Sequence, residues 1–319
     1  MRWIAVLAAG AALVAPAAAS AQDPVPAAPA PPAPQLALQA EKALPVGHDL
    51  VVLRKHAYRV SGTMTPAVAG QKVALAIHRN GKLIRTVRTP VRADGTFSRR
   101  MPTRRQGRFS VRALHAATPE LGAARGPKVS VEVVEPRAAE GARGPLVKLL
   151  QRSLARLHYA VSNSGTFDAA TARAVMAFRK VNGMARRYDA DRRVIEKAVA
   201  GKGAFKVRHP EAGHHVEADL SRQVLALIDG RKVVATYHSS SGAPATPTVI
   251  GTFRVYLKTP GTNAKGMVNS SYFIRGYAIH GYIDVPAFNA SHGCLRIPIP
   301  DASRVFNWLN IGDRVIVYP

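Results

Sequence analysis

The amino-acid sequence predicts a multidomain, mostly β protein: a basic β-sandwich, then a three-helix module, then a β-rich C-terminal domain. Three observations lead to this fold class. Short β-rich runs separated by turn residues fill residues 48–136, leucines then recur at helical spacing over residues 143–201, and alternating runs return over residues 210–319. A chain of 319 residues is also longer than one typical domain, so two or three domains are expected.

Residues 1–21 are expected to be a secretory signal peptide. The apolar run Trp3–Val14 follows a basic residue and precedes Ala19-Ser20-Ala21, a typical small-residue cleavage site. An uncleaved anchor is the alternative, which the alanine-rich run and Pro16 disfavour. The mature protein is therefore expected to be secreted to the outer side of the cytoplasmic membrane, with membrane contact only through the signal. Residues 22–47, rich in alanine and proline, are expected to form a semi-stiff spacer.

Residues 48–136 are expected to form a small antiparallel sandwich of the immunoglobulin or fibronectin type, with hairpin turns at Asn80-Gly81 and Asp94-Gly95. The expected strands are Leu50–Arg54, Tyr58–Met64, Lys72–His78, Leu83–Thr89, Thr96–Met101, Phe109–His115 and Lys128–Val134. Between Arg54 and Arg112 lie fifteen lysines or arginines and one acid, in a chain with a formal net charge of +26. Attachment to an anionic polymer and a set of solvated arginines explain this charge equally well. No nucleic-acid-binding motif occurs, so nucleic acid is not an expected partner.

Residues 143–201 are expected to form three helices. Pro145 suits a first helical turn, and Asp168 and Asp189 are expected to cap the second and third helices. The leucines that share one face of the first helix are Leu146, Leu150, Leu154 and Leu157.

Residues 210–319 are expected to be mostly β, with one short helix over Asp301–Leu309. A hairpin turn at Asp229-Gly230 separates two of the first alternating runs. These runs are Val216–Leu220, Gln223–Asp229 and Lys232–Ser239.

The chemistry of the chain is expected to centre on Cys294, its only cysteine. A thiol is a nucleophile only as its thiolate, and a neighbouring imidazole is the usual base. His280 and His292 are the candidate imidazoles. Gly293 removes a side chain where a substrate carbonyl must approach, and its backbone N–H is a candidate oxyanion-hole donor. A zinc site made by the two histidines and Cys294 is the alternative, although no carboxylate nearby is placed as a general base.

The segment Ser291-His292-Gly293-Cys294-x-Arg296, with His280 upstream, resembles the signature of L,D-transpeptidases of the YkuD type. The match extends to Thr248–Phe253, where Val249 replaces the usual proline. Residues 143–201 resemble the three-helix peptidoglycan-binding module, through Leu150-Gln151, Gly165-Thr166-Phe167-Asp168, Thr171, Ala174-Val175 and Phe178. The resemblance implies an enzyme whose partners are peptidoglycan stem peptides and glycan, with anionic wall polymers as further candidates. It implies no metal and no cofactor.

The resemblance also implies roles for the site residues. Cys294 would be the nucleophile, and His280 would accept and later donate the proton. His292 and Gly293 would support the oxyanion hole. Residues expected to contact substrate are Arg296, Tyr282 and Ser291, although a salt bridge from Arg296 to Asp284 or Asp301 explains that arginine equally well.

Three functions remain open from the sequence. An amine acceptor, from a second stem peptide or from a protein, makes the chain a transpeptidase that forms cross-links through a thioester, in cell-wall biogenesis. Water as the acceptor makes it an L,D-carboxypeptidase. A wall-binding scaffold with an inactive catalytic domain is the third, and the intact Cys294, His280 and His292 argue against it.

Overall fold

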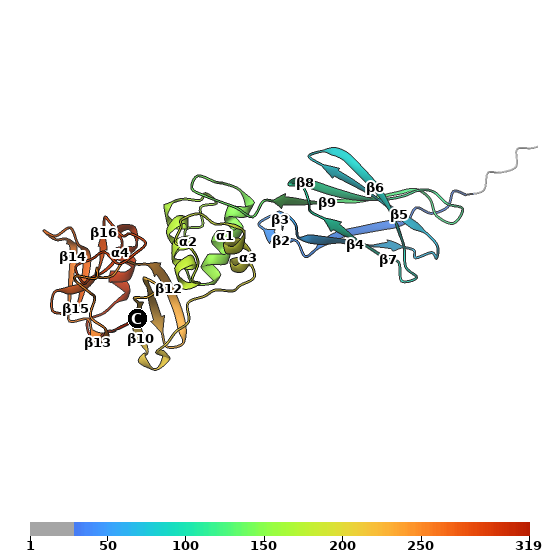
Figure 1. Cartoon of the computed structure of the whole chain (residues 1–319). Helices are drawn as coiled ribbons and strands as arrows, with labels where there is room; N and C mark the ends of the chain where they lie inside the picture. The colour runs from blue at the N-terminus through green and yellow to red at the C-terminus, as the bar shows by residue number, and fades with distance from the viewer. Residues whose placement is uncertain (1–28) are drawn as a thin grey trace, which may run out of the picture.

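The computed structural model describes residues 29–319. The predicted signal peptide and the first part of the predicted spacer lie outside the described residues. Three bodies follow one another along the chain: an N-terminal β-sandwich, a helical module and a C-terminal β domain (Figure 1). Within residues 29–319, no helix is both long and apolar enough to cross a membrane.

The N-terminal sandwich is built from two sheets with a common core. One sheet has the strand order β1-β4-β7 and the other β2-β3-β9-β8-β5-β6. The buried residues Val60 and Phe97 of the first sheet pack with Leu75, Val111 and Val131 of the second. The strands are β1 (Gln35–Glu41), β2 (Leu44–Val46), β3 (Asp49–Leu53), β4 (Ala57–Thr65), β5 (Lys72–Arg79), β6 (Lys82–Pro90), β7 (Thr96–Pro102), β8 (Gly107–His115) and β9 (Ala124–Val134).

The predicted boundary between spacer and sandwich at residue 47 is wrong. β1 and β2 lie inside the predicted spacer, and β1 pairs antiparallel with β4 along its full length. Leu36, Leu38 and Ala40 alternate along β1 and pack against the sandwich core. This alternation is the usual signal of a half-buried strand. The alanine- and proline-rich composition just before it concealed the signal.

The helical module contains α1 (Pro145–Arg156), α2 (Ala169–Val181) and α3 (Arg192–Val199). Asp168 caps α2 by accepting a hydrogen bond from the Thr171 N–H at 2.8 Å. The third helix is capped by Asp191, which accepts from the Val194 N–H at 3.1 Å, and not by the predicted Asp189. An N-cap must be the residue directly before the first helical one, and α3 begins two residues later than the sequence suggested.

The C-terminal domain consists of two further sheets, with strand orders β12-β11-β10-β18-β13 and β14-β15-β16-β17. Buried residues of both sheets, including Leu225, Ile279 and Val315, form the core between them, and Val305 of α4 joins it. The elements are β10 (His214–Asp219), β11 (Val224–Asp229), β12 (Lys232–His238), β13 (Gly251–Arg254), β14 (Leu257–Thr262), β15 (Val268–Ile274), β16 (Tyr277–Tyr282), β17 (Leu295–Pro298), α4 (Ile299–Trp308) and β18 (Arg314–Tyr318).

The helical module and the C-terminal domain share one hydrophobic core. Leu150 and Phe178 of the module cluster with Val224, Ala226 and Ile228 on the face of β11 that lies away from the C-terminal core. Separating the two segments would expose the apolar surface of this core to water, at a free-energy cost of about 25 cal/mol per Å² of apolar area. The two segments therefore behave as one body.

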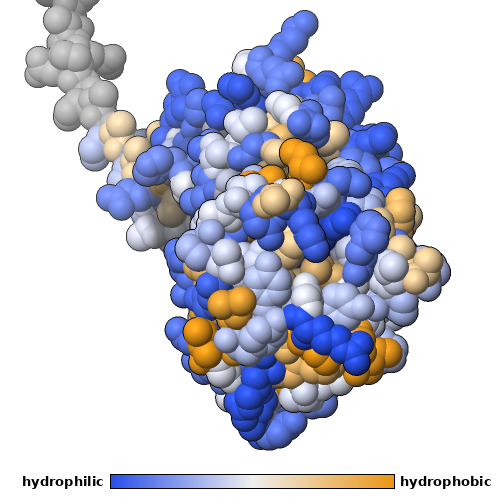
Figure 2. Space-filling model, turned by 90° about the vertical axis from the view of Figure 1, so that its left-hand side faces the viewer, coloured by the Kyte–Doolittle hydropathy of each residue, from blue (hydrophilic) through white to orange (hydrophobic). Residues whose placement is uncertain are grey.

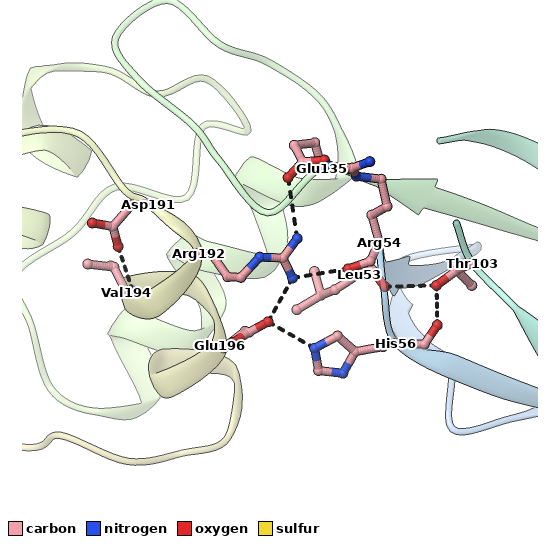
Figure 3. A network of polar contacts seen from close by, with 9 residues as sticks. All are labelled: Leu53, Arg54, His56, Thr103, Glu135, Asp191, Arg192, Val194 and Glu196. Atoms are coloured by element: carbon pink, nitrogen blue, oxygen red, sulfur yellow. Dashed lines mark hydrogen bonds and ion pairs between the residues drawn. The ribbon is translucent and has the colours of Figure 1, made fainter. Parts of the chain in front are cut away.

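The sandwich meets the helical module partly through a polar network (Figure 3). The Arg192 guanidinium of α3 donates to the Arg54 carbonyl at 3.0 Å and pairs with Glu135 at 3.3 Å and Glu196 at 2.9 Å. His56 also contacts Glu196, at 2.9 Å. These ion pairs are partly exposed, so each contributes at most about 1 kcal/mol. Apolar packing joins the same two bodies, because Val46, Val51 and Leu53 of the sandwich belong to the hydrophobic cluster that contains Leu150 and Phe178 of the module.

Candidate active site

The parallel pairing of β16 and β17 brings His280 and Cys294 together. His280 lies in β16, and Cys294 directly precedes β17. The register places Ile279 opposite Leu295 and His280 opposite Arg296. The Cys294 thiol lies 3.9 Å from the Gly276 carbonyl oxygen, at the residue before β16. His280 is thus held within a strand, and Cys294 lies in the turn that leads directly into the neighbouring strand.

These residues line a cavity of about 430 Å³ at the four-stranded sheet. Five of the residues predicted from the sequence contribute to its wall: His280, Tyr282, His292, Cys294 and Arg296. Tyr277, which flanks His280 in the sequence, also lines the cavity, and the sequence analysis missed three others, which are Lys265, Met267 and Gly276. Lys265 and Met267 belong to the segment between β14 and β15, and no motif in that segment marks them.

His280 is held as a neutral imidazole with a free nitrogen lone pair. Its ring is 2 % exposed, and Nδ1 lies 2.9 Å from the Gly281 carbonyl oxygen. A carbonyl only accepts, so Nδ1 carries the proton and Nε2 is left as the base. Burial lowers the pKa of His280, and the Arg296 charge lowers it further, against the opposing effect of the Gly281 carbonyl.

Cys294 is a half-buried thiol. Burial raises its pKa, which the Ala278 N–H and the charges of Arg296 and Lys265 partly oppose. The resting pair is therefore a neutral thiol beside a neutral imidazole, and not a preformed thiolate–imidazolium pair. Proton transfer must then accompany the attack on substrate.

Gly293 is required by its backbone and by the ring of Tyr277. Its φ is +107°, a conformation that side-chain-bearing residues rarely adopt. A Cβ at this position would lie 2.3 Å from Cε1 of Tyr277. The glycine therefore makes room for the ring of Tyr277, and the approach of a substrate carbonyl at this position stays a prediction.

Ser291 closes the turn that carries the cysteine. Its side chain is 1 % exposed; its hydroxyl donates to the Cys294 carbonyl at 2.7 Å and accepts from the Gly293 N–H at 3.1 Å. Both hydrogen bonds lie within the turn of Ser291 itself, and its substrate contact stays a prediction. The Gly293 N–H thus donates to Ser291 in this structure, and its oxyanion role stays a prediction.

Thr248 supports the same turn from the upstream motif. Its hydroxyl donates to the Gly293 carbonyl at 2.9 Å and accepts from the Gly242 N–H at 2.8 Å. The replacement of the usual proline by Val249 therefore does not remove this support, because the hydroxyl of Thr248 provides it.

Arg296 lies with its guanidinium 4.1 Å from the centre of the Tyr282 ring, and that ring meets His280 edge to face. The predicted salt bridge of Arg296 to Asp284 or Asp301 is not formed. Asp301 pairs instead with Arg173 of the helical module, at 3.1 Å. The positive charge of Arg296 is left facing the cavity, together with Lys265.

His292 is exposed at the rim of the cavity. Across residues 29–319, no three His, Cys, Asp or Glu side chains are arranged to hold a metal ion. The zinc alternative needed His280, His292 and Cys294 to converge on one point, and they do not form such a group.

The segment of residues 283–290 lies between β16 and β17 and is fixed partly by the helical module. The carbonyl of Val285 accepts from His238 Nε2 at 2.8 Å, and Lys180 of α2 donates to His238 Nδ1 at 2.8 Å. Arg186 donates to the Ala287 carbonyl at 2.7 Å. The sequence analysis missed these residues, because contacts between domains leave no local pattern.

The surface of the C-terminal domain is mostly hydrophilic and carries several separate apolar patches (Figure 2). Two large apolar side chains of the linking segment, Ile283 and Phe288, are 85 % and 60 % exposed.

Comparisons with known proteins agree with this geometry. The family model for the L,D-transpeptidase catalytic domain, YkuD, matches residues 213–317, and the model for a putative peptidoglycan binding domain matches residues 143–186. A solved L,D-transpeptidase (residues 123–326) from Xylanimonas cellulosilytica is 30 % identical, covering 58 % of this chain and 98 % of that chain with a TM-score of 0.53. A solved L,D-transpeptidase from Stackebrandtia nassauensis is 21 % identical, covering 58 % of this chain and 96 % of that chain with a TM-score of 0.36. No curated protein matches the chain. The expected resemblance is confirmed, and the chain belongs to the L,D-transpeptidase family.

Proposed function

We propose that this chain is a peptidoglycan L,D-transpeptidase, a transferase that works through a thioester on Cys294. The observation that carries the proposal is the pairing of β16 and β17, which sets the lone pair of His280 Nε2 and the Cys294 thiol in one cavity. The proposed reaction is acyl transfer between stem peptides.

In the first step, His280 Nε2 takes the thiol proton while Sγ attacks the carbonyl on the L-centre of a stem-peptide diamino acid. The tetrahedral intermediate collapses, His280 returns the proton to the leaving amine, and terminal D-alanine departs. A thioester on Cys294 remains. In the second step an acceptor amine attacks the thioester and loses a proton to His280. The new amide bond forms, and the proton returns to Sγ.

We assign oxyanion stabilisation to the Cys294 N–H, because the Gly293 N–H donates to Ser291. His292, at the rim, supports the same oxygen as a second donor. Lys265 and Arg296 are assigned to a carboxylate of the stem peptide, since both cations line the cavity and Arg296 forms no ion pair with any described residue.

Two attachment roles complete the proposal. The helical module and the basic sandwich, with its immunoglobulin-like arrangement, hold the secreted enzyme on the wall. If so, deletion of both should release the protein from purified sacculi, and added salt should weaken the share of the sandwich, because exposed charges are screened over about 10 Å at 0.1 M salt. Equal sacculus binding by residues 210–319 alone would contradict both roles.

The reaction is tested by incubating the soluble protein with disaccharide-tetrapeptides and weighing the products by mass spectrometry. Cross-linked dimers are expected, and Cys294→Ala should abolish them while leaving the melting temperature close to that of the wild type. Tripeptides without dimers would show water as the acceptor and a carboxypeptidase. Unchanged substrate would favour a wall-binding scaffold.

A further inference from the structure

A second cavity, of about 960 Å³, lies where the helical module meets the C-terminal domain. Its wall is made by the C-terminal ends of α2 and α3, the segment after α3 and the turn between β10 and β11. None of the residues that line the catalytic cavity contributes to it. It is more than twice as large as the catalytic cavity, which is about 430 Å³.

The charge of this groove is entirely positive. Its basic side chains are Lys180, Arg186, Lys197, Lys202, Lys206 and Arg222, and no carboxylate lines it. Burial lowers the pKa of Lys180 to about 6, so this amine adds little positive charge at neutral pH. Arg222 is partly neutralised by Asp219 at 3.6 Å, and Lys180 is buried with its three hydrogen bonds made. Lys197, Lys202 and Lys206 form no ion pair within the described part of the chain. Three such lysines around one hollow create a positive potential that an anionic ligand relieves.

The backbone that carries these lysines is held in place. The Gly203 carbonyl accepts from the Tyr159 hydroxyl at 2.6 Å and from the Asn182 side chain at 3.0 Å. Gly203 has a φ of +99°, and a Cβ there would lie 2.7 Å from Asn182 Oδ1. The N–H of Lys202 also donates to the Lys197 carbonyl at 3.0 Å. The lysines thus project from a preformed rim, which reduces the ordering cost of binding.

Apolar groups lie between the cations. The groove is also lined by Val181, Met184, Ala204 and Phe205. A lone phosphate would leave these groups and most of the volume without contacts. A short peptide that carries several carboxylates among methyl groups matches both the charge and the apolar lining.

We propose that this groove binds a carboxylate-bearing peptidoglycan stem peptide, as a second site beside the catalytic cavity. The inference rests on the proposed function for the identity of the peptide. Arg186 is left out of the test, because it also fixes the segment next to the catalytic strands through the Ala287 carbonyl.

The test uses the full chain with Cys294→Ala, so that ligand is bound and not turned over. Lys197→Gln, Lys202→Gln and Lys206→Gln are combined in one variant. The matched control removes three exposed charges of the same module that lie outside the groove, with Lys148→Gln, Arg152→Gln and Arg193→Gln. Binding of a disaccharide-tetrapeptide is measured by calorimetry, beside the same compound with its carboxylates amidated and beside inorganic polyphosphate.

We expect two binding sites for the free-carboxylate ligand in the Cys294→Ala protein, and the loss of one, by about tenfold or more in affinity, in the groove variant. The control variant and the Cys294→Ala protein should agree within about twofold. The affinity of the amidated ligand for the unmodified groove should be as low as the affinity of the free-carboxylate ligand for the groove variant. Equal losses in the control, undiminished binding of the amidated ligand, or groove binding of polyphosphate alone would each overturn the proposal.

Acylation of Cys294 separates this proposal from the proposed function. The three lysine substitutions in the protein with its native cysteine should leave the rate of acylation by a carbapenem unchanged, as measured by intact mass. A protein that is not acylated at all would contradict the proposed reaction and not the groove. A groove variant that is acylated more slowly than the control variant would contradict the independence of the two sites.

Discussion

Gly293→Ala should be among the most damaging small substitutions in this chain. The structure gives two separate reasons. The φ of +107° is unfavourable for any residue with a Cβ, and the new methyl would lie 2.3, 2.8 and 2.9 Å from three atoms of the Tyr277 ring. Real Cβ atoms do not approach other atoms this closely, so the ring or the turn must move.

The expected cost follows from these two causes. A residue held in a sparsely populated backbone conformation costs about 1–3 kcal/mol. Forcing an extra methyl into a packed position costs about another 1–3 kcal/mol. The sum of about 2–6 kcal/mol lowers the melting temperature by about 2–4 °C per kcal/mol for a unit of about 150–250 residues. A shift of the turn also displaces Cys294, the next residue, from His280.

The assay is thermal unfolding by circular dichroism together with the rate of Cys294 alkylation. Gly276→Ala is the matched control, because Gly276 lines the same cavity and a Cβ there would meet nothing within 4 Å. Its melting temperature should stay close to that of the wild type. In the Tyr277→Ala background, Gly293→Ala should lower the melting temperature by less than it does in the wild type. The part of the loss that comes from the clash with the ring should disappear, and the part that comes from the backbone conformation should remain.

A Gly293→Ala protein that melts like the Gly276→Ala control would refute this reasoning. So would a double variant in which the two losses simply add, because the ring would then not be the obstacle.

Three further predictions concern the base, the pH profile and the contact between module and catalytic domain. His280→Ala should abolish acylation and slow the alkylation of Cys294 at neutral pH. His292→Ala should slow acylation but leave the thiol pKa closer to that of the wild type. A thiolate that is lost only in the His292→Ala variant would make His292 the base. Because burial lowers the pKa of His280, the acylation rate should fall only below about pH 6.5, as the imidazole becomes protonated, and a profile that rises with the thiol pKa above pH 9 instead would argue against a histidine base. Arg173→Ala leaves the largely buried Asp301 without its partner, so the free energy of unfolding, measured with denaturant, should fall by about 1–3 kcal/mol. This loss should shrink at acid pH, where Asp301 is neutral, and a loss that does not change with pH would exclude the ion pair as its cause.

Local patterns predicted most of the elements and the reactive residues. The cap at Asp168, the leucine face of α1 and the helix near Asp301 follow from short-range spacing, and the structure contains each of them. The leucines of β1 alternate as in a half-buried strand, but β1 follows directly on an alanine- and proline-rich stretch, whose composition is typical of a spacer.

The sequence by itself determined the identity of the reactive groups, because a single cysteine, two histidines and a glycine lie within fifteen residues of one another. Only the tertiary structure decided how those groups are arranged. It is the register between β16 and β17 that places His280 beside the thiol, and the Gly281 carbonyl that selects its tautomer. Lys265 and the bonds from Lys180 and Arg186 come from distant segments of the chain. Contacts of this kind depend on how separate elements pack, and no periodicity or motif within a single element encodes them.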